Sequence, residues 1–156
     1  MNVRIMTKED VPFVEQMEQQ IFSRPWSQRG FFDALENPAA LFLVAEEEEN
    51  GSTGNPAKEI AGYIGMYIAL DEGEITNVAV SESFRGRGIG NLLVQSMICK
   101  ARRQAVTRIV LEVRCSNQPA IHLYEKNAFV KVGVRRGFYE APREDADIMV
   151  WEEHAG

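Results

Sequence analysis

Residues 74–105, EITNVAVSESFRGRGIGNLLVQSMICKARRQA, hold the pattern that decides the fold. Residues 74–80 predict a β-strand, and residues 88–105 place apolar side chains at helical spacing. Between the two lies the turn RGRGIGN, residues 85–91. A strand, a glycine-rich turn and a helix N-terminus form an anion site, because glycines bring backbone N–H groups close to a phosphate and the helix dipole favours negative charge.

The spacing within this turn narrows the class of phosphate ligand. It lacks the GxxxxGK pattern of P-loop nucleotide sites, with their lysine and Mg²⁺-binding hydroxyl. A dinucleotide fold places its glycine turn in the first strand–helix unit, whereas this turn follows several predicted strands past the middle of the chain. Arg85, Gly88 and Gly90 instead fit the pattern Gln/Arg-x-x-Gly-x-Gly/Ala, and Arg85 and Arg87 add positive charge.

The rest of the chain predicts strands and helices in an order that defines the fold class. The strands are expected at residues 3–5, 41–46, 59–70, 74–80, 108–114, 129–135 and 147–151. The helices are expected after a cap at Thr7 and at residues 27–37, 88–105 and 117–127. This order predicts an α/β domain whose mixed, mainly antiparallel central sheet is flanked by helices. Residues 46–58 are expected to form an exposed acidic loop.

The size and composition of the chain fit one domain. Its 156 residues are 45% hydrophobic and 26% charged, so we expect a single domain over residues 1–156. No run approaches the roughly 18 apolar residues that span a bilayer, and the start of the chain is acidic, which predicts a cytoplasmic protein with no membrane partner. Cys99 and Cys115 have no paired metal-ligand spacing, so free thiols and no metal site are expected.

Charge divides along the chain. Residues 1–82 carry 5 basic and 15 acidic side chains, whereas residues 83–156 carry 12 basic and 8 acidic ones. The resulting net charges of −10 and +4 disfavour general binding to nucleic acid. The acidic part suits a cationic partner, and the basic part suits a small anionic ligand.

Further motifs accompany the glycine turn. They are NVAV at residues 77–80, LEVRCSN at 111–117 followed by AIHLYE at 120–125, PWS at 25–27, and EDA at 144–146. Together with the turn they resemble the GNAT superfamily of N-acetyltransferases over nearly the whole chain, and within it the bacterial branch of ribosomal-protein-alanine N-acetyltransferases. The resemblance implies acetyl-CoA as the cosubstrate and no metal.

The resemblance also implies which residues bind acetyl-CoA. The turn would hold the pyrophosphate, the strand at residues 77–80 would hold the acetyl and pantetheine groups through its backbone, and Asn117 would contact the pantetheine. The implied acetyl-CoA residues are Val78, Ala79, Val80, Arg85, Gly86, Arg87, Gly88, Ile89, Gly90, Asn91 and Asn117.

Acetyl transfer to an amine needs a proton acceptor for the amine and a proton donor for the leaving thiolate. Strand alternation places Glu112 on the face opposite Leu111 and Val113, where its carboxylate could accept that proton directly or through water. Tyr124 follows Asn117 by two helical turns, so both project from one side of the same helix. The resemblance implies that Glu112 is the general base and Tyr124 the general acid.

Other assignments stay open for these residues. From the sequence alone, Glu112 also fits an ordinary outward strand glutamate, and Tyr124 a packed core tyrosine. Glu74 is the second choice, either as base or as an anchor for the acceptor amine. An acyl-enzyme on Cys115 is disfavoured because no His stands beside it, and a small buried thiol is expected there.

The acceptor is expected to be an α-amine. A peptide α-amine has a pKa of about 7.7–8.0 against about 10.4 for lysine, so its neutral form costs less free energy to reach. The resemblance implies the N-terminal alanine of small-subunit ribosomal protein eighteen, whose basic N-terminal segment would suit acids such as Asp71, Glu72 and Glu74. Trp26 and Tyr139 are candidate residues of the acceptor groove, although Trp26 equally fits a core anchor. The alternatives are an acetyltransferase for lysine or a small amine, and a non-catalytic acyl-CoA-binding domain.

Two departures from the family pattern bear on selectivity and on the fold. Residues 135–139 read RRGFY, so Phe138 stands where the family often has a second tyrosine. Ala128 replaces the usual glycine after the last helix, and Asn127 is expected to adopt the left-handed conformation in its place.

Overall fold

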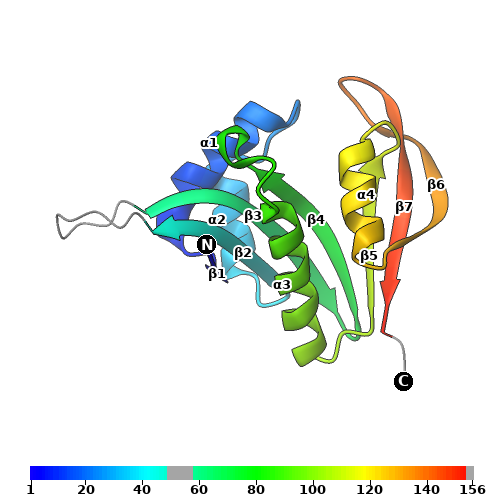
Figure 1. Ribbon diagram of the computed structural model, residues 1–156, viewed down its shortest axis with the longest axis horizontal. Helices are drawn as coiled ribbons and strands as arrows, with labels where there is room; N and C mark the ends of the chain where they lie inside the picture. Colours follow the sequence, from blue (N-terminus) through cyan, green and yellow to red (C-terminus); the bar gives the residue numbers. More distant parts are fainter. Residues whose placement is uncertain (49–57, 154–156) are drawn as a thin grey trace.

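A seven-stranded sheet runs through the centre of the structure, a computed structural model that describes residues 1–48 and 58–153 (Figure 1). The strands are β1 (Asn2–Ile5), β2 (Ala40–Glu48), β3 (Lys58–Ala69), β4 (Glu72–Val80), β5 (Arg108–Arg114), β6 (Val130–Tyr139) and β7 (Glu144–Glu152). Their spatial order is β1-β2-β3-β4-β5-β7-β6, and every neighbouring pair is antiparallel except the parallel pair β4 and β5. The mixed, mainly antiparallel sheet is therefore confirmed. Residues 49–57 of the acidic loop lie outside the described residues.

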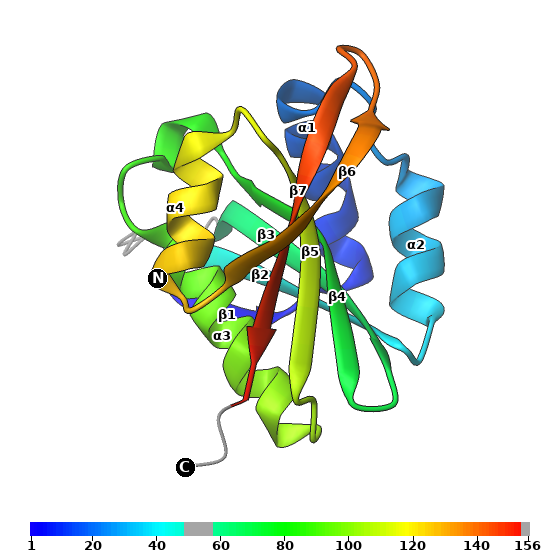
Figure 2. The ribbon, with the colours of Figure 1, turned by 90° about the vertical axis from the view of Figure 1, so that its right-hand side faces the viewer.

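Two pairs of helices cover the two faces of this sheet (Figure 2). One face carries α1 (Val11–Ile21) and α2 (Gln28–Glu36), and the other carries α3 (Ile89–Arg103) and α4 (Gln118–Lys126). Among the described residues, no helix is long and apolar enough to cross a membrane.

Each helix pair buries its apolar face in a core of its own. The core under α3 and α4 includes Leu93, Met97, Ile109, Leu111 and Met149. The core under α1 and α2 includes Val11, Val14, Phe31, Phe42 and Tyr63. Burying one large apolar side chain stabilises a fold by about 1.5–3 kcal/mol, so these two cores hold the helices against the sheet.

Side-chain caps set where two of the helices begin. The Ser27 hydroxyl accepts a hydrogen bond from the Gly30 N–H at 3.2 Å and starts α2. The Asn117 Oδ1 accepts one from the Ala120 N–H at 3.2 Å and starts α4. The helix expected after Thr7 begins instead with a 3-10 turn, Lys8–Asp10, before α1.

A bulge in β4 opens the sheet on one side. Ile75 pairs with Met66 and Asn77 pairs with Gly65, which leaves Thr76 as an extra residue. The extra residue reverses the alternation of side chains, because Ile75 packs under α3 and α4 whereas Ala79 packs under α1 and α2. In the described part of the chain, β4 pairs with β5 only over Glu72–Ile75, and beyond this point the two strands diverge (Figure 1).

Several predicted boundaries and conformations differ from the structure. The helix expected at residues 88–105 is shorter, because Gly88 and Ala105 have φ angles of +76° and +62° and lie outside it. The last two strands are longer than expected and run to Tyr139 and from Glu144.

Two single-residue expectations are wrong. Ala128, with φ +68°, takes the left-handed conformation expected of Asn127. The reason is the backbone bonding that ends α4: the Ala128 N–H donates to the Glu125 carbonyl and the Phe129 N–H to the Tyr124 carbonyl, both at 3.0 Å, a pattern that places the left-handed residue at position 128. The Asn127 Nδ2 donates to Asn91 Oδ1 and to the Leu123 carbonyl, both at 2.9 Å, which holds α4 against α3. Cys115 is exposed rather than buried, because it lies in the turn after β5, where its Sγ donates to Glu144.

Candidate active site

A cleft of about 1450 Å³ opens where β4 and β5 diverge. Its wall includes fourteen of the predicted site residues: Trp26, Val78, Ala79, Val80, Arg85, Gly86, Gly88, Ile89, Gly90, Asn91, Glu112, Asn117, Tyr124 and Tyr139. Two predicted residues, Glu74 and Arg87, are not part of this wall. Elements far apart in the chain thus bring the predicted cosubstrate, catalytic and acceptor residues to one cleft.

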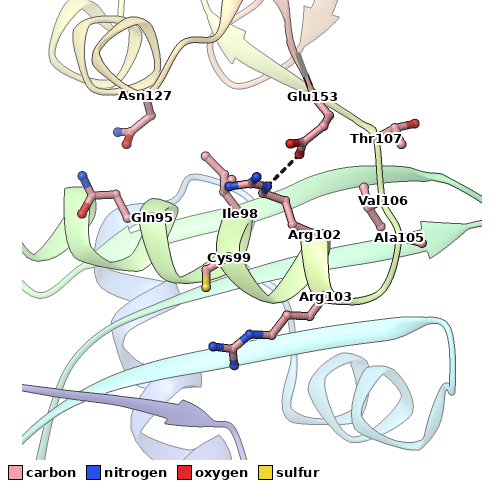
Figure 3. A pocket seen from close by; sticks show the side chains of 10 residues that line it. All are labelled: Gln95, Ile98, Cys99, Arg102, Arg103, Ala105, Val106, Thr107, Asn127 and Glu153. Atoms are coloured by element: carbon pink, nitrogen blue, oxygen red, sulfur yellow. Dashed lines mark ion pairs between the residues drawn. The ribbon is translucent and has the colours of Figure 1, made fainter. Parts of the chain in front are cut away.

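A second hollow, of about 650 Å³, lies beside the C-terminal half of α3 (Figure 3). Figure 3 shows Cys99, Arg102 and Glu153 around it, with Arg102 Nε 2.7 Å from Glu153 Oε2. Among the described residues, none of those predicted for the site lines this hollow. The candidate active site is therefore the cleft between β4 and β5.

The glycine turn before α3 has an open backbone. Gly86 and Gly88 have φ angles of +79° and +76°, a region that side chains rarely adopt. A Cβ at either position would meet no atom within 4 Å. Glycine is therefore required by backbone conformation and not by crowding, and the turn leaves space for a ligand against the first N–H groups of α3.

The two arginines of the turn are held differently. The Arg87 guanidinium lies 5.1 Å from the centre of the Phe84 ring and 3.9 Å from the Glu47 carboxylate. Arg85 lines the cleft. Arg85 thus belongs to the wall of the cleft at the candidate anion site, whereas Arg87 contacts Phe84 and Glu47 and is not part of that wall.

Close contacts fix the start of α3 against α4. A Cβ on Gly90 would lie 3.1 Å from Leu123 Cδ2, so glycine allows the two helices to approach. The side chain of Asn91 accepts a hydrogen bond from Asn127, as described above. The anion site and the helix that carries Tyr124 thus form one packed unit.

Glu112 lies on the cleft side of β5, as strand alternation predicted. Ile109, Leu111 and Val113 are buried on the opposite face. Burial raises the pKa of the Glu112 carboxyl, the Glu74 carboxylate raises it further, and the Arg135 guanidinium, 3.6 Å away, lowers it. A carboxylate with a raised pKa is a stronger base than an exposed glutamate.

Two tyrosines complete this wall. Tyr124 is 7% exposed and packs against Phe129 with ring centres 5.7 Å apart, and burial raises its pKa. Tyr139 donates a hydrogen bond to the backbone carbonyl of Glu112 at 3.1 Å. Burial, and then the Glu112 charge, raise the pKa of Tyr139 to about 12. Both phenols are therefore protonated near neutral pH and can donate a proton or a hydrogen bond.

The candidate acceptor side of the cleft lies between the segment after α1 and the turn after β6. The Trp26 ring packs against Phe31 and Phe42, with ring centres 5.3 and 5.9 Å apart, and also lines the cleft. The interpretation of Trp26 as a core anchor is confirmed by this packing, and its place in the acceptor groove stays a prediction. Arg24 reaches Glu140 across the two segments at 2.7 Å.

Sequence reasoning gave no site role to Glu144, whose partner Arg114 lines the cleft, or to Glu18. Glu144 accepts from the Ser116 N–H at 2.9 Å and lies 3.2 Å from Arg114, and these partners, the serine first, lower its pKa to about 2. Glu18, which is 2% exposed, also lines the cleft. The available signal was its position, seven residues after Val11 and four after Val14, on the apolar face of α1.

Comparison with known proteins agrees with this geometry. The profile of the Acetyltransferase (GNAT) family matches residues 11–129. The [Ribosomal protein bS18]-alanine N-acetyltransferase of Salmonella typhimurium is 33% identical over 94% of this chain and 94% of its own length. The crystal structure of the ribosomal-protein-S18-alanine N-acetyltransferase from Escherichia coli superimposes with a TM-score of 0.84 and 28% identity, over 99% of this chain and 96% of that one.

A second solved structure shares the fold at lower identity. Arabidopsis thaliana NAA60 in complex with acetyl-CoA gives a TM-score of 0.84 at 21% identity, over 97% of both chains. The match of the family profile to most of the chain, and a relative above 30% identity over its length, show that this chain belongs to the GNAT family of acetyltransferases.

Proposed function

We propose that this protein transfers the acetyl group of acetyl-CoA to the N-terminal α-amine of a protein, with the N-terminal alanine of ribosomal protein S18 as its substrate. The observation that carries the proposal is the cleft between β4 and β5, whose wall includes residues of the glycine turn together with Glu112, Tyr124 and Trp26. The names of the relatives in Salmonella typhimurium and Escherichia coli support the choice of acceptor.

The residues of the cleft fit acetyl-CoA. The turn at residues 85–91 and the N-terminus of α3 would hold the pyrophosphate, with Arg85 as the cationic side chain. The edge of β4 beyond Ile75 has no pairing with β5, so backbone groups of residues 78–80 would bind the pantetheine chain as a further strand binds. The Asn117 Oδ1 already accepts the hydrogen bond that caps α4, so the Nδ2 group of the same side chain would contact the pantetheine. Bound acetyl-CoA supplies the activated acetyl group.

Glu112 would prepare the acceptor for attack. Its carboxylate takes the proton from the α-ammonium group, directly or through a water molecule, and the neutral nitrogen then attacks the thioester carbonyl. The raised pKa of Glu112 brings it closer to the pKa of about 8 of an α-amine, which makes this proton transfer less unfavourable.

Tyr124 would protonate the leaving thiolate of CoA as the C–S bond breaks, and its phenolate would then regain a proton, directly or through water, from the nitrogen that has formed the new C–N bond. A phenol with a raised pKa is protonated throughout the neutral range, so the donor form is always present. The burial that raises the pKa of Tyr124 also disfavours a bare thiolate beside it, so the two pKa values rise together and the transfer remains feasible. Tyr139 contacts the Glu112 backbone and would help to form the acceptor side.

A basic peptide suits the charge around the acceptor side. Glu74 lies outside the cleft wall but near enough to raise the pKa of Glu112, and Asp71 and Glu72 precede it in the chain at the start of β4, where Glu72 pairs with Arg108 at 3.1 Å. These acids would attract a positively charged N-terminal segment over a distance of about 8–10 Å at physiological ionic strength.

Mass spectrometry tests the acceptor directly. The protein is incubated with acetyl-CoA and a peptide that begins Ala-Arg and contains an internal lysine, and the acetyl group is located by fragmentation. Acetylation of the α-amine is expected. A matched peptide with a methyl-blocked N-terminus should not react. Modification of lysine alone, or turnover of small amines without turnover of peptides, would reject the proposed acceptor.

A further inference from the structure

Glu18 is a buried carboxylate for which the proposed acetyl transfer has no use. It is 2% exposed, and burial raises its pKa. An apolar residue would complete the apolar face of α1 at this position without the cost of burying a charge. The carboxylate therefore has a purpose other than packing, and its partners indicate what that purpose is.

The two oxygens of Glu18 hold two different parts of the cleft. Its Oε1 accepts a hydrogen bond from the backbone N–H of Trp26 at 3.3 Å, in the segment that forms the acceptor side. Its Oε2 accepts one from the hydroxyl of Tyr63, a fully buried residue of β3. One carboxylate thus joins the acceptor segment to the central sheet.

The second branch continues to the bulge in β4. The Asn77 Nδ2 donates to the Tyr63 hydroxyl at 3.3 Å, and the Thr76 hydroxyl donates to the Asn77 Oδ1 at 2.6 Å. Asn77 is 6% exposed, and Thr76 is the extra residue of the bulge. We call the set of Glu18, Tyr63, Asn77 and Thr76, with the Trp26 N–H, the Glu18 network.

The bulge determines which face of the sheet each side chain of β4 occupies beyond Thr76. Beyond Thr76 the side chains of β4 change faces, and the strand leaves β5 to form the cleft. Beyond the bulge, β4 keeps its pairing with β3 from Asn77 to Val80, but on its other edge it has lost the pairing with β5 that holds Glu72–Ile75. The Glu18 network supplies side-chain bonds at this point.

We propose that Glu18 is a positioning residue that fixes the acceptor segment at Trp26 and the bulged part of β4 relative to each other. This inference rests on the proposed function, because it takes the Trp26 segment to contact the acceptor amine and the bulged part of β4 to bind the acetyl group. Glu18 acts through its partners and does not itself exchange a proton with either substrate.

Two variants separate the branches of the network. Tyr63→Phe removes the branch to β4 and keeps the bond from Glu18 to the Trp26 N–H. Glu18→Ala removes both branches. Glu18→Gln keeps the volume and one acceptor oxygen, and it serves as a second test should the alanine variant fold poorly. Glu36→Gln, at an exposed position in α2, is the matched control.

Steady-state kinetics and amide hydrogen exchange measure what the loss of each branch does to catalysis and to local structure. Tyr63→Phe should lower kcat about tenfold, as expected for the loss of one or two buried hydrogen bonds, and leave the KM for peptide within about twofold of wild type. Glu18→Ala should lower kcat to a similar extent and raise the KM for peptide about tenfold. In amide exchange, Glu18→Ala should lose protection at residue 26 and at residues 76–78, and Tyr63→Phe only at residues 76–78.

The outcomes that overturn the proposal are specific. A purely structural role would lower the Tm of Glu18→Ala while leaving its kcat and both KM values unchanged. Fully independent effects in the double variant of Glu18 and Tyr63 would show that no shared network exists. If the wild-type protein acetylates no peptide, the proposed function fails, and the exchange pattern alone then decides whether Glu18 links the two segments.

Discussion

The two walls of the cleft offer a ligand different chemistry. The wall formed by β4, the glycine turn and the start of α3 presents backbone groups at glycines with positive φ. The wall formed by β5, α4 and β6 presents ionisable side chains whose pKa values are raised by burial and by each other. Backbone groups do not titrate, so under the proposed function the binding of acetyl-CoA at the first wall would depend little on pH, whereas proton transfer would depend on the ionisable groups of the second wall. Variants in the two walls should therefore affect different kinetic constants.

The largest effect is expected at Glu112. Glu112→Gln removes the proton acceptor and should lower kcat about 10³-fold, within the range for general base catalysis. The dissociation constant of CoA, measured by calorimetry, should change by less than about twofold, because binding belongs to the other wall. Glu74→Gln is the matched control and should keep kcat within about threefold. A larger loss at Glu74 than at Glu112 would show that the base is misassigned.

A somewhat smaller loss is expected at Tyr124. Tyr124→Phe keeps the packing against Phe129 and removes the hydroxyl, which should lower kcat about 10²-fold because water can partly replace the proton donor. Tyr67→Phe, outside the cleft, should have no effect on kcat. The kcat values are measured from the rate at which free CoA thiol is released during turnover. Wild-type kcat in Tyr124→Phe would remove this residue from the mechanism.

A variant in the opposite wall should change the affinity for CoA rather than kcat. Gly88→Ala forces a side chain into a conformation with φ +76°, at a cost of about 1–2 kcal/mol, and should weaken CoA binding about tenfold with little change in kcat at saturation. Gly133→Ala is the control, because its added Cβ would meet Ile148 at an ordinary 3.7 Å. Equal CoA affinity in both variants would contradict the assignment of the turn as the pyrophosphate site.

The smallest effect concerns pH. Arg135 lowers the pKa of Glu112 by its positive charge, so Arg135→Ala should raise that pKa. The carboxylate is the active form, so the acid limb of the kcat–pH profile should move to higher pH. Arg136→Ala, an exposed neighbour, should leave the profile in place. An unchanged acid limb in Arg135→Ala would mean that Glu112 does not set it.

Features that depend on local sequence could be predicted. The cap at Ser27, the apolar spacing of α3 and the alternation around Glu112 all act within a few residues, and the structure has them as predicted. The glycine turn belongs to the same class, because glycine permits the positive φ that Gly86 and Gly88 adopt, although the helix expected from Gly88 begins one residue later.

Features that depend on distant contacts could not be predicted. The bond between Tyr63 and Glu18 joins positions 45 apart in the chain, and the one between Tyr139 and Glu112 joins positions 27 apart. The extra residue in β4 is defined only by its pairing with β3, and no residue type in that strand marks it. The ion pair between Arg87 and Glu47 likewise joins positions far apart in the chain.

The central claim is that one cleft, between β4 and β5, brings acetyl-CoA and a peptide α-amine together at Glu112. A crystal structure of the protein with CoA joined through an acetyl linker to the α-amine of an Ala-Arg peptide tests it most directly. The account predicts the pyrophosphate at residues 85–91, the peptide nitrogen beside the Glu112 carboxylate, and the first peptide residues against Trp26 and Tyr139. Electron density for the ligand in the hollow beside α3, or a peptide nitrogen beyond the reach of Glu112, would contradict it.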